Sequence, residues 1–277
     1  MEETAYAKIN LALHVRVREA DGYHDIETLF AFAATGDRLL VAPSEALTLA
    51  VTGPFAVQLE GVEDNLVLRA ADALRNRYGV GGGATLTLEK YLPVASGIGG
   101  GSADAAAALR LLNRWWEIGA DEGELLEIAG TLGADVPACV RSELVRGVGR
   151  GDLLSSQDPE GIAGMPLLLV NPRILVSTAE VFAAWDGSDR GPLGIASPLA
   201  TALEGRNDLE APASAIAPEI RQVLAILSAL PGAILSRMSG SGATCFALFA
   251  REEDCDAAKD VVGALQPNWW QLATQLR

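Results

Sequence analysis

A dense glycine cluster followed directly by an alanine-rich segment constrains this chain more than any other feature. Glycines occupy four of the five positions 97–101, apart from Ile98, and residues 105–112 consist mostly of Ala and Leu. Glycine is entropically costly to order, and close approach of the backbone to an anion is one reason to keep such a cluster. The Ala- and Leu-rich segment predicts a helix that begins at Ser102. Since a helix N-terminus presents free N–H groups and a positive dipole end, this pattern predicts a phosphate-binding loop.

Two common phosphate-binding loops are excluded by the residues themselves. A Walker A loop has a lysine after its last glycine, but Gly101 is followed by Ser102. A dinucleotide fingerprint has glycines at offsets of zero, two and five, but offset five from Gly97 is Ser102 and from Gly99 is Asp104. A nicotinamide oxidoreductase therefore fails on spacing. The alternative to a phosphate-binding loop is a flexible surface turn that precedes a helix.

The composition is that of a globular chain without specialised segments. The 277 residues are long enough for one large domain or two modest ones. No apolar stretch reaches the roughly 18 residues of a membrane span, and residues 1–4 lack a secretion signal. Three cysteines without metal-ligand spacing are typical of reduced thiols in a cytoplasmic protein. With two histidines in the chain, we expect no His-rich metal site.

The formal net charge of −15 argues against nucleic acid and anionic membrane as partners. It does not exclude phosphate binding, because salt confines exposed charges to about 8–10 Å. Local amides, a lysine and bound Mg²⁺ can therefore dominate such a site. The oligomeric state is not determined by any of these features.

Alternating and helical patterns intermix along the chain without regular βα repetition, which favours an α+β fold. A glycine-rich change of texture over 147–165 places a domain boundary there, and we put it between residues 155 and 156. The patterns predict strands at 9–17, 39–42, 47–51, 84–89, 167–170, 233–238 and 245–249, and helices at 65–78, 102–116, 121–132, 177–185, 218–230 and 254–265.

Several segments, in order and spacing, closely resemble the GHMP kinase superfamily over nearly the whole chain. They are Ala7-Lys-Ile-Asn-Leu11, Asp21-Gly-Tyr-His24, Asn65-Leu66, the loop Pro93–Asp104, Gly133-Ala-Asp-Val-Pro137, Asn207-Asp-Leu-Glu210 and Met238-Ser-Gly-Ser-Gly-Ala243. The Lys-Ile-Asn strand followed by Asp-Gly-Tyr-His resembles one branch of that family, rather than the homoserine or mevalonate kinases.

This resemblance implies two domains, 1–155 with a ribosomal-S5-domain-2-like fold and 156–277 with a ferredoxin-like fold. It also implies transfer of the γ-phosphoryl group of ATP, with Mg²⁺, to a hydroxyl of a small substrate that carries a cytidine diphosphate group. A second hypothesis is a catalytically silent nucleotide-binding module that retains the fold. The presence of Lys8 and Asp135 disfavours that module.

The catalytic roles come from the resemblance. Asp135 looks like the base at the attacking hydroxyl, although a cap or turn role is the commoner fate of such an aspartate. Lys8 would lie near Asp135, hold it ionised and stabilise developing charge, although a lone strand lysine is usually solvated. No metal ligand is assigned.

The remaining site residues form two groups that the resemblance implies. Tyr23 and His24 would hold the cytosine ring, and Asn10 would bind substrate hydroxyls. The ATP group is Pro93, Val94, Ala95, Ser96, Gly97, Ile98, Gly99, Gly100, Gly101, Ser102 and Ala103; the substrate group is Asn10, Tyr23, His24, Ser239, Gly240, Ser241 and Gly242.

The chain departs from the family pattern at two positions. The family form has two serines after the glycines, but here Ser102 is followed by Ala103, which removes one hydroxyl. Backbone amides can still make most phosphate contacts, so we expect activity to survive. Arg150 stands where the family typically has an acidic residue, and Asp104 is interpreted as no more than a helix cap.

Overall fold

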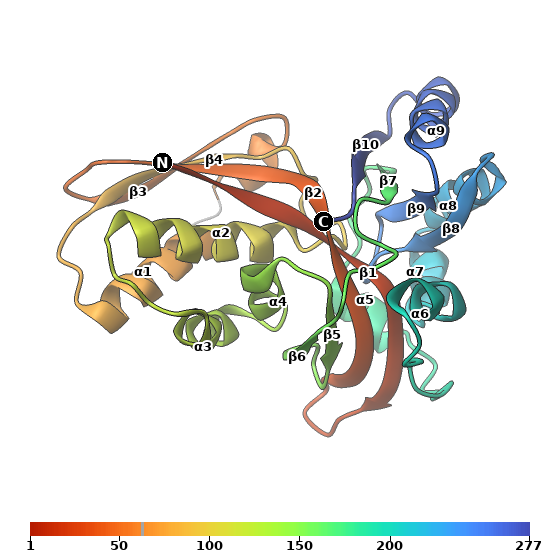
Figure 1. Ribbon diagram of the computed structural model, residues 1–277, viewed down its shortest axis with the longest axis horizontal. Helices are drawn as coiled ribbons and strands as arrows, with labels where there is room; N and C mark the ends of the chain where they lie inside the picture. Colours follow the sequence, from red (N-terminus) through yellow and green to blue (C-terminus); the bar gives the residue numbers. More distant parts are fainter. Residues whose placement is uncertain (62–63) are drawn as a thin grey trace. The chain divides into compact units, whose positions relative to one another are not determined.

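The computed structural model describes residues 1–61 and 64–277, and its contacts divide the chain into two discontinuous units (Figure 1). Unit 1 comprises Met1–Ala7, Thr35–Val94 and Gly99–Ser142, and unit 2 comprises Lys8–Ala34, Ala95–Ile98 and Glu143–Arg277. The strands β1 (Glu2–Arg18) and β2 (His24–Ala42) therefore contribute residues to both units. The two units are discontinuous in sequence and do not test a single boundary between residues 155 and 156, which stays a prediction.

Unit 1 packs helices against a small sheet. Strand β4 pairs in parallel with β3 and antiparallel with the second half of β2. The elements are β3 (Leu47–Thr52), a 3-10 helix η1 (Ala56–Leu59), α1 (Leu66–Tyr78), β4 (Ala84–Glu89), α2 (Gly100–Trp115), α3 (Glu122–Leu132) and α4 (Val136–Arg141).

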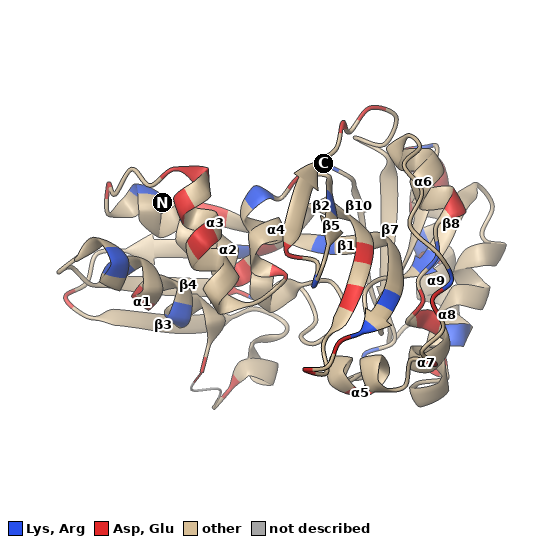
Figure 2. Ribbon diagram, turned by 90° about the horizontal axis from the view of Figure 1, so that it is seen from below, with Lys and Arg blue, Asp and Glu red and all other residues tan. Residues whose placement is uncertain are grey.

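Helix α2 is the centre of unit 1. Its residues 103–109 are all buried, and it packs against α1, α3 and α4. Four consecutive alanines, 105–108, permit this because their short side chains let neighbouring elements approach on every side. Figure 2 shows basic residues on α1 and acidic ones on α3, and Arg77 pairs with Glu127 at 2.7 Å.

Unit 2 contains an antiparallel four-stranded sheet in the order β10-β7-β9-β8, and the first half of β2 pairs with β5, which pairs with β6. The elements are β5 (Val145–Val148), β6 (Leu153–Ser156), β7 (Pro166–Asn171), α5 (Thr178–Ala183), α6 (Pro198–Glu204), α7 (Glu210–Ile216), α8 (Glu219–Ala229), β8 (Ala233–Met238), β9 (Cys245–Phe249), α9 (Glu252–Leu265) and β10 (Trp270–Gln275).

The core of unit 2 explains why its central strands read as continuous apolar runs. Strands β7 and β9 are buried along nearly their whole lengths, and α8 and α9 pack against the sheet. Val223 and Leu227 of α8 and Val262 of α9 are completely buried in the same cluster as Phe249. The three cysteines are free and buried.

The α+β class is confirmed, and each predicted helix and strand exists; the strands predicted at 84–89, 233–238 and 245–249 have the predicted ends, and the other elements have shifted ends. Strand β2 begins at His24 instead of residue 39. The sequence did not predict η1, α4, β5, β6, α6, α7 or β10. Strands β5 and β6 lie in the glycine-rich stretch. A Cβ atom on Gly147 would lie 2.9 Å from the Phe30 ring, so this glycine serves close packing inside a strand. Among the described residues, no helix has the length and apolarity to cross a membrane.

Candidate functional site

The glycine cluster forms a loop whose backbone requires glycine at its turning points. Gly97 has φ +78° and Gly99 has φ +63°, values in the left-handed region that side chains resist. Helix α2 begins at Gly100, and Gly99 occupies the N-cap position. The expectation that the helix begins at Ser102 is therefore wrong: Ser102 lies inside the first turn, because the left-handed turn at Gly99 already starts the helix. The first amides of α2 follow the loop, as a phosphate site requires.

Within unit 2 the loop residues 95–98 pack against the second glycine loop, residues 239–242. A Cβ atom on Gly97 would lie 2.5 Å from the carbonyl oxygen of Ser239 and 2.7 Å from that of Gly242. The hydroxyl of Ser239 donates to the Gly97 carbonyl at 2.8 Å, and the Thr244 amide donates to the Ser96 carbonyl at 3.0 Å. The structure thus brings together two groups that the sequence assigned to ATP and to substrate.

Asn10 lies beside these two loops with an unused oxygen. Its backbone N–H donates to Ser239 Oγ at 3.1 Å, and its Nδ2 donates to Thr28 Oγ1 at 2.8 Å. Because the Thr28 hydroxyl donates its proton to the Ala12 carbonyl, Thr28 accepts from Asn10, which fixes the amide orientation. Asn10 Oδ1 is buried with no hydrogen-bond partner among the described residues, and a Cβ atom on Gly240 would be 3.4 Å from it. A ligand hydroxyl could satisfy it.

Lys8 is 3% exposed on β1, which corrects the ordinary expectation of a solvated strand lysine. Its ammonium lies 4.0 Å from the centre of the Phe30 ring, where the ring's negative face attracts a cation. Its backbone N–H donates to the Ile98 carbonyl at 3.0 Å. Strand β1 therefore places Lys8 and Asn10 beside the residues 95–98 of the loop.

Asp135 belongs to unit 1 and occupies the N-cap position of α4, where the sequence indicated a break in structure. Pro137 stands in the first turn, a position in which proline does not disturb a helix. The Asp135 side chain makes no capping hydrogen bond and is half-buried. A simple capping role therefore does not account for it.

His24 is buried between aromatic rings of unit 2. Its ring centroid lies 5.0 Å from that of Phe182 and 5.7 Å from that of Trp185, and Arg18 Nε donates to its Nε2 at 3.1 Å. Burial, together with the charge of Arg18, lowers the pKa of His24. The ring is therefore neutral at pH 7, with Nε2 as acceptor and the proton on Nδ1.

Tyr23 is 56% exposed, and the arginine that departs from the family pattern covers one face of its ring. The Arg150 guanidinium lies 3.9 Å from the ring centre and pairs with Asp21. Arg150, Asp21 and His24 line a cavity of about 450 Å³, together with Glu19, Ala20, Asp25 and Gly149. The structure thus brings Tyr23, His24 and Arg150 to one place.

Several residues that organise this region were not singled out individually by the sequence. Asn207 Nδ2 donates to the carbonyls of Met238 and Gly240, both at 2.8 Å, and so holds the second glycine loop from behind. Ser241 Oγ bonds the Thr178 hydroxyl at 2.8 Å. Arg237 is buried and donates to the carbonyls of Leu11, Ala202 and Gly205, and burial lowers its pKa to about 10, which leaves it charged. Asn207 had a signal, the Asn-Asp-Leu-Glu segment.

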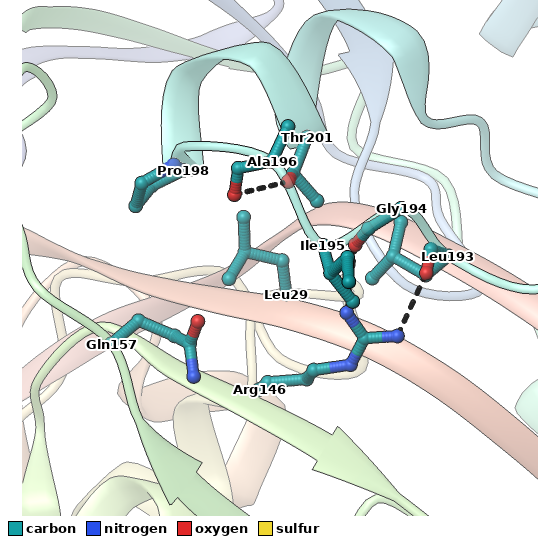
Figure 3. A pocket seen from close by; sticks show the side chains of 9 residues that line it. All are labelled: Leu29, Arg146, Gln157, Leu193, Gly194, Ile195, Ala196, Pro198 and Thr201. Carbon is teal, nitrogen blue, oxygen red and sulfur yellow. Dashed lines mark hydrogen bonds between the residues drawn. The ribbon is translucent and has the colours of Figure 1, made fainter.

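A second cavity, of about 190 Å³, contains none of the predicted site residues (Figure 3). Arg146 points into it but donates to the carbonyls of Leu193 and Gly194, at 2.8 and 2.7 Å, and to Glu27 at 2.6 Å. Its guanidinium is thus used in holding the 193–196 segment. Among the described residues there is no cluster of three or more His, Cys, Asp or Glu that could hold a metal.

Two protein families match the chain. The family described as GHMP kinases N terminal domain matches residues 65–143, and the family described as GHMP kinases C terminal matches residues 189–268. The first match covers α1 to α4, including the loop-bearing helix α2, and the second covers the region of Asn207 and the Ser239–Gly242 loop.

Two proteins that are similar to this chain along its whole length have the same name. A 4-diphosphocytidyl-2-C-methyl-D-erythritol kinase of Rhizorhabdus wittichii is 60% identical over 99% of this chain and 94% of that protein. One of Sphingopyxis alaskensis is 53% identical over 100% of this chain and 99% of that protein.

Solved structures agree with these relatives. The crystal structure of a 4-(cytidine 5'-diphospho)-2C-methyl-D-erythritol kinase is 34% identical, covers 100% of this chain and 99% of its own, and has a TM-score of 0.84. A mevalonate kinase of L. major is 16% identical, covering 99% of this chain and 96% of its own, with a TM-score of 0.68, and shares the fold.

Proposed function

We propose, because this chain belongs to the GHMP kinases and among them to the 4-diphosphocytidyl-2-C-methyl-D-erythritol kinases, that it phosphorylates the 2-hydroxyl of 4-diphosphocytidyl-2-C-methyl-D-erythritol. ATP supplies the γ-phosphoryl group and leaves as ADP, in the synthesis of isoprenoid precursors. The observation that carries this proposal is the contact of residues 95–98 with the Ser239–Gly242 loop, beside Lys8 and Asn10.

The glycine loop from Pro93 to Ala103 binds the ATP phosphates in this proposal. The backbone amides at the start of α2 donate hydrogen bonds to the phosphates, so the lack of a hydroxyl at Ala103 has little effect on phosphate binding. Ala103 is 2% exposed and packs into the core of unit 1, where a serine hydroxyl would need a partner. This burial gives a physical reason for alanine at that position.

Lys8 and Asp135 act on the reacting atoms. Asp135 accepts the proton of the attacking 2-hydroxyl, and the buried Lys8 ammonium stabilises the charge on the transferring phosphoryl group. Positioning and charge neutralisation supply most of the catalysis in such transfers. Asn10 Oδ1, buried and unsatisfied, accepts a hydrogen bond from a substrate hydroxyl.

The cytosine base binds at Tyr23 and His24. The free face of the Tyr23 ring stacks on the base, since Arg150 covers the other face. The neutral His24 ring donates from Nδ1 to a base acceptor, because Arg18 already occupies Nε2. Ser239, Gly240, Ser241 and Gly242 contact the remaining part of the substrate.

The donor set of this chain fits a Mg²⁺ ion that the ATP phosphates carry. Mg²⁺ in such sites takes one or two protein ligands and keeps phosphate and water ligands, which agrees with the lack of a carboxylate cluster among described residues. Of the two serines in the loop, Ser102 lies in the first turn of α2, where its hydroxyl would reach the ion. The ion would supply neutralisation of phosphate charge.

We also propose that the enzyme works in the cytoplasm on small molecules.

The test measures ADP release with Mg²⁺-ATP and each of three acceptors. We expect turnover with the cytidyl substrate and little with mevalonate or homoserine. Faster turnover with either of the latter two would assign the chain to another kinase of the superfamily.

A second measurement examines the catalytic pair. Asp135→Asn should lose turnover by about 100-fold or more while it keeps binding ATP, whereas the surface variant Asp72→Asn serves as the matched control. Retained turnover in Asp135→Asn would reject the base assignment. Absence of turnover in the wild-type chain would favour a silent nucleotide-binding module.

A further inference from the structure

A buried ion cluster lies behind the glycine loop in unit 1. Lys90 Nζ bonds Asp37 Oδ2 at 2.5 Å and Asp104 Oδ2 at 2.6 Å. The side chains of all three residues are at most 4% exposed. This corrects the interpretation of Asp104 as a helix cap: it is the fifth residue of α2 and faces the interior. No role assigned above uses this cluster.

The cluster connects the segment that enters the loop with the helix that leaves it. Asp37 Oδ1 accepts the backbone N–H groups of Tyr91 at 2.5 Å and Leu92 at 2.8 Å, just before the loop starts at Pro93. Asp104 is on α2, one turn after the helix begins. Lys90 joins the two carboxylates, and so links both ends of the loop through one ammonium group.

Lys90 also lies directly under the first residue of α2. A Cβ atom on Gly100 would be 3.1 Å from Lys90 Nζ, so the ammonium leaves little room for a side chain at the first residue of the helix. Asp104 Oδ1 is buried without a hydrogen-bond partner in the described chain. A buried carboxylate oxygen without a hydrogen-bond partner lowers the stability of the fold. A cluster that contains such an oxygen therefore points to a role other than stability.

We propose that the Lys90–Asp37–Asp104 cluster positions the phosphate-binding loop, holding its entry and the start of α2 at the spacing that ATP phosphates require. Lys90, Asp37 and Asp104 are positioning residues and touch neither substrate in this proposal. The inference rests on the proposed function in that the loop must bind ATP. A loop that is already held in its binding conformation loses little entropy when the nucleotide binds. Loss of this order should therefore weaken the affinity for ATP.

The test compares Asp104→Asn with the wild-type protein and with a control on β1 that weakens other ion pairs of the same helix. Asp104→Asn keeps the side-chain shape but removes the ion pair with Lys90. We expect its KM for ATP to rise about 10-fold, with the KM for the cytidyl substrate within about 2-fold of wild type. The control, Glu3→Gln, weakens the pairs of Glu3 with Arg110 and Arg114 of α2, at 3.0 and 2.6 Å. It should lower stability without changing either KM.

A role in stability alone would give a different result. It would reduce the fraction of active enzyme, and hence kcat per total protein, while both KM values stay at wild type. That outcome for Asp104→Asn overturns the proposal, as does an equal rise of both KM values.

A second variant and a direct binding measurement protect the test from a folding defect. Asp37→Asn/Lys90→Met/Asp104→Leu replaces the whole cluster by uncharged groups, an exchange that folded proteins often tolerate, and the amide oxygen at position 37 can still accept from the Tyr91 and Leu92 N–H groups. Titration calorimetry with a non-hydrolysable ATP analogue should show weaker binding by this folded variant, by about 10-fold. Unchanged affinity rejects the positioning role. Because this readout needs no phosphoryl acceptor, it stays valid if the wild-type protein fails to phosphorylate the cytidyl substrate.

Discussion

The backbone N–H of Asn10 donates to the hydroxyl oxygen of Ser239, 229 positions later in the chain, at 3.1 Å. The same hydroxyl donates to the carbonyl of Gly97 at 2.8 Å. One side chain thus joins strand β1, the first glycine loop and the second glycine loop. This connection is the structural basis for treating the three segments as parts of one site.

We expect Ser239→Ala to cost about 1–3 kcal/mol in the free energy of unfolding, because it leaves the Asn10 N–H without a partner in the protein interior. Turnover should fall as well, since the two loops lose their direct link. Urea unfolding and steady-state kinetics measure both effects. Ser228→Ala is the control, because the exposed Ser228 hydroxyl bonds only the carbonyl three residues earlier in α8. Equal stability of the two variants would contradict this role of Ser239.

Gly97→Ala should damage the site more than its backbone conformation alone explains. Gly97 and Gly161 both have φ +78°, but a Cβ atom meets backbone at 2.5 Å at Gly97 and open space at Gly161. The left-handed conformation costs a residue with a Cβ about 1–2 kcal/mol at either position. Gly97→Ala should therefore lower the unfolding midpoint further than Gly161→Ala and weaken ATP-analogue binding, which the control should retain. Similar losses in both variants would show that loop contact is unimportant.

The stack of Arg150 on Tyr23 gives a physical account of the departure from the family pattern. Removal of the guanidinium in Arg150→Ala should leave Tyr23 less ordered and raise the KM for the cytidyl substrate by about 2- to 5-fold, the range of an exposed cation–π contact. The KM for ATP and kcat should not change. Arg190→Ala, which removes an exposed arginine paired with Asp186, is the matched control. An unchanged KM in Arg150→Ala would limit the stack to a surface contact.

The pH dependence of substrate capture should report the state of His24. Burial and the charge of Arg18 lower the pKa of His24 below its usual 6.5, so its environment in the folded protein favours the neutral ring over the protonated one. We expect kcat/KM for the cytidyl substrate to stay constant down to about pH 6.5 and to decline at lower pH. In Arg18→Met the charge that lowers the pKa is gone, and the decline should move to higher pH. A profile that is the same in both proteins would exclude His24 from the titration.

The elements with a strong local pattern were predictable, and those that depend on distant partners were not. The strand at 9–17 and the helix after the glycine loop follow from side-chain periodicity and alanine content. The start of that helix was misplaced, because preference for serine at an N-cap yielded to the left-handed turn at Gly99. Local sequence cannot reveal that Lys90 and Asp104 meet, since no periodicity connects positions 14 apart.

The candidate site shows the same division. Lys8, Asn10, Gly97 and Ser239 were singled out by the resemblance, and the structure brings them together in unit 2. Arg150 was recognised as a departure, but its partners Tyr23 and Asp21 became evident only from the fold. Thr178, whose hydroxyl bonds that of Ser241, carries no chemical signal in the sequence that distinguishes it from a surface residue.

The pH dependence of stability should reveal the buried Asp104. Its desolvation, with Asp37 nearby, raises its pKa from 3.8 to about 7 despite the attraction of Lys90. The folded state therefore binds more protons than the unfolded state between these two values, and the contribution of Asp104 to stability is lost as the pH rises from about 4 to about 7. Asp104→Asn cannot ionise, so its free energy of unfolding should fall less across this window than that of the wild type. Urea titrations at several pH values measure the two slopes, which should coincide below about pH 3, where Asp104 is protonated in both states. Equal slopes across the whole range would show that Asp104 does not titrate in the folded protein near neutral pH.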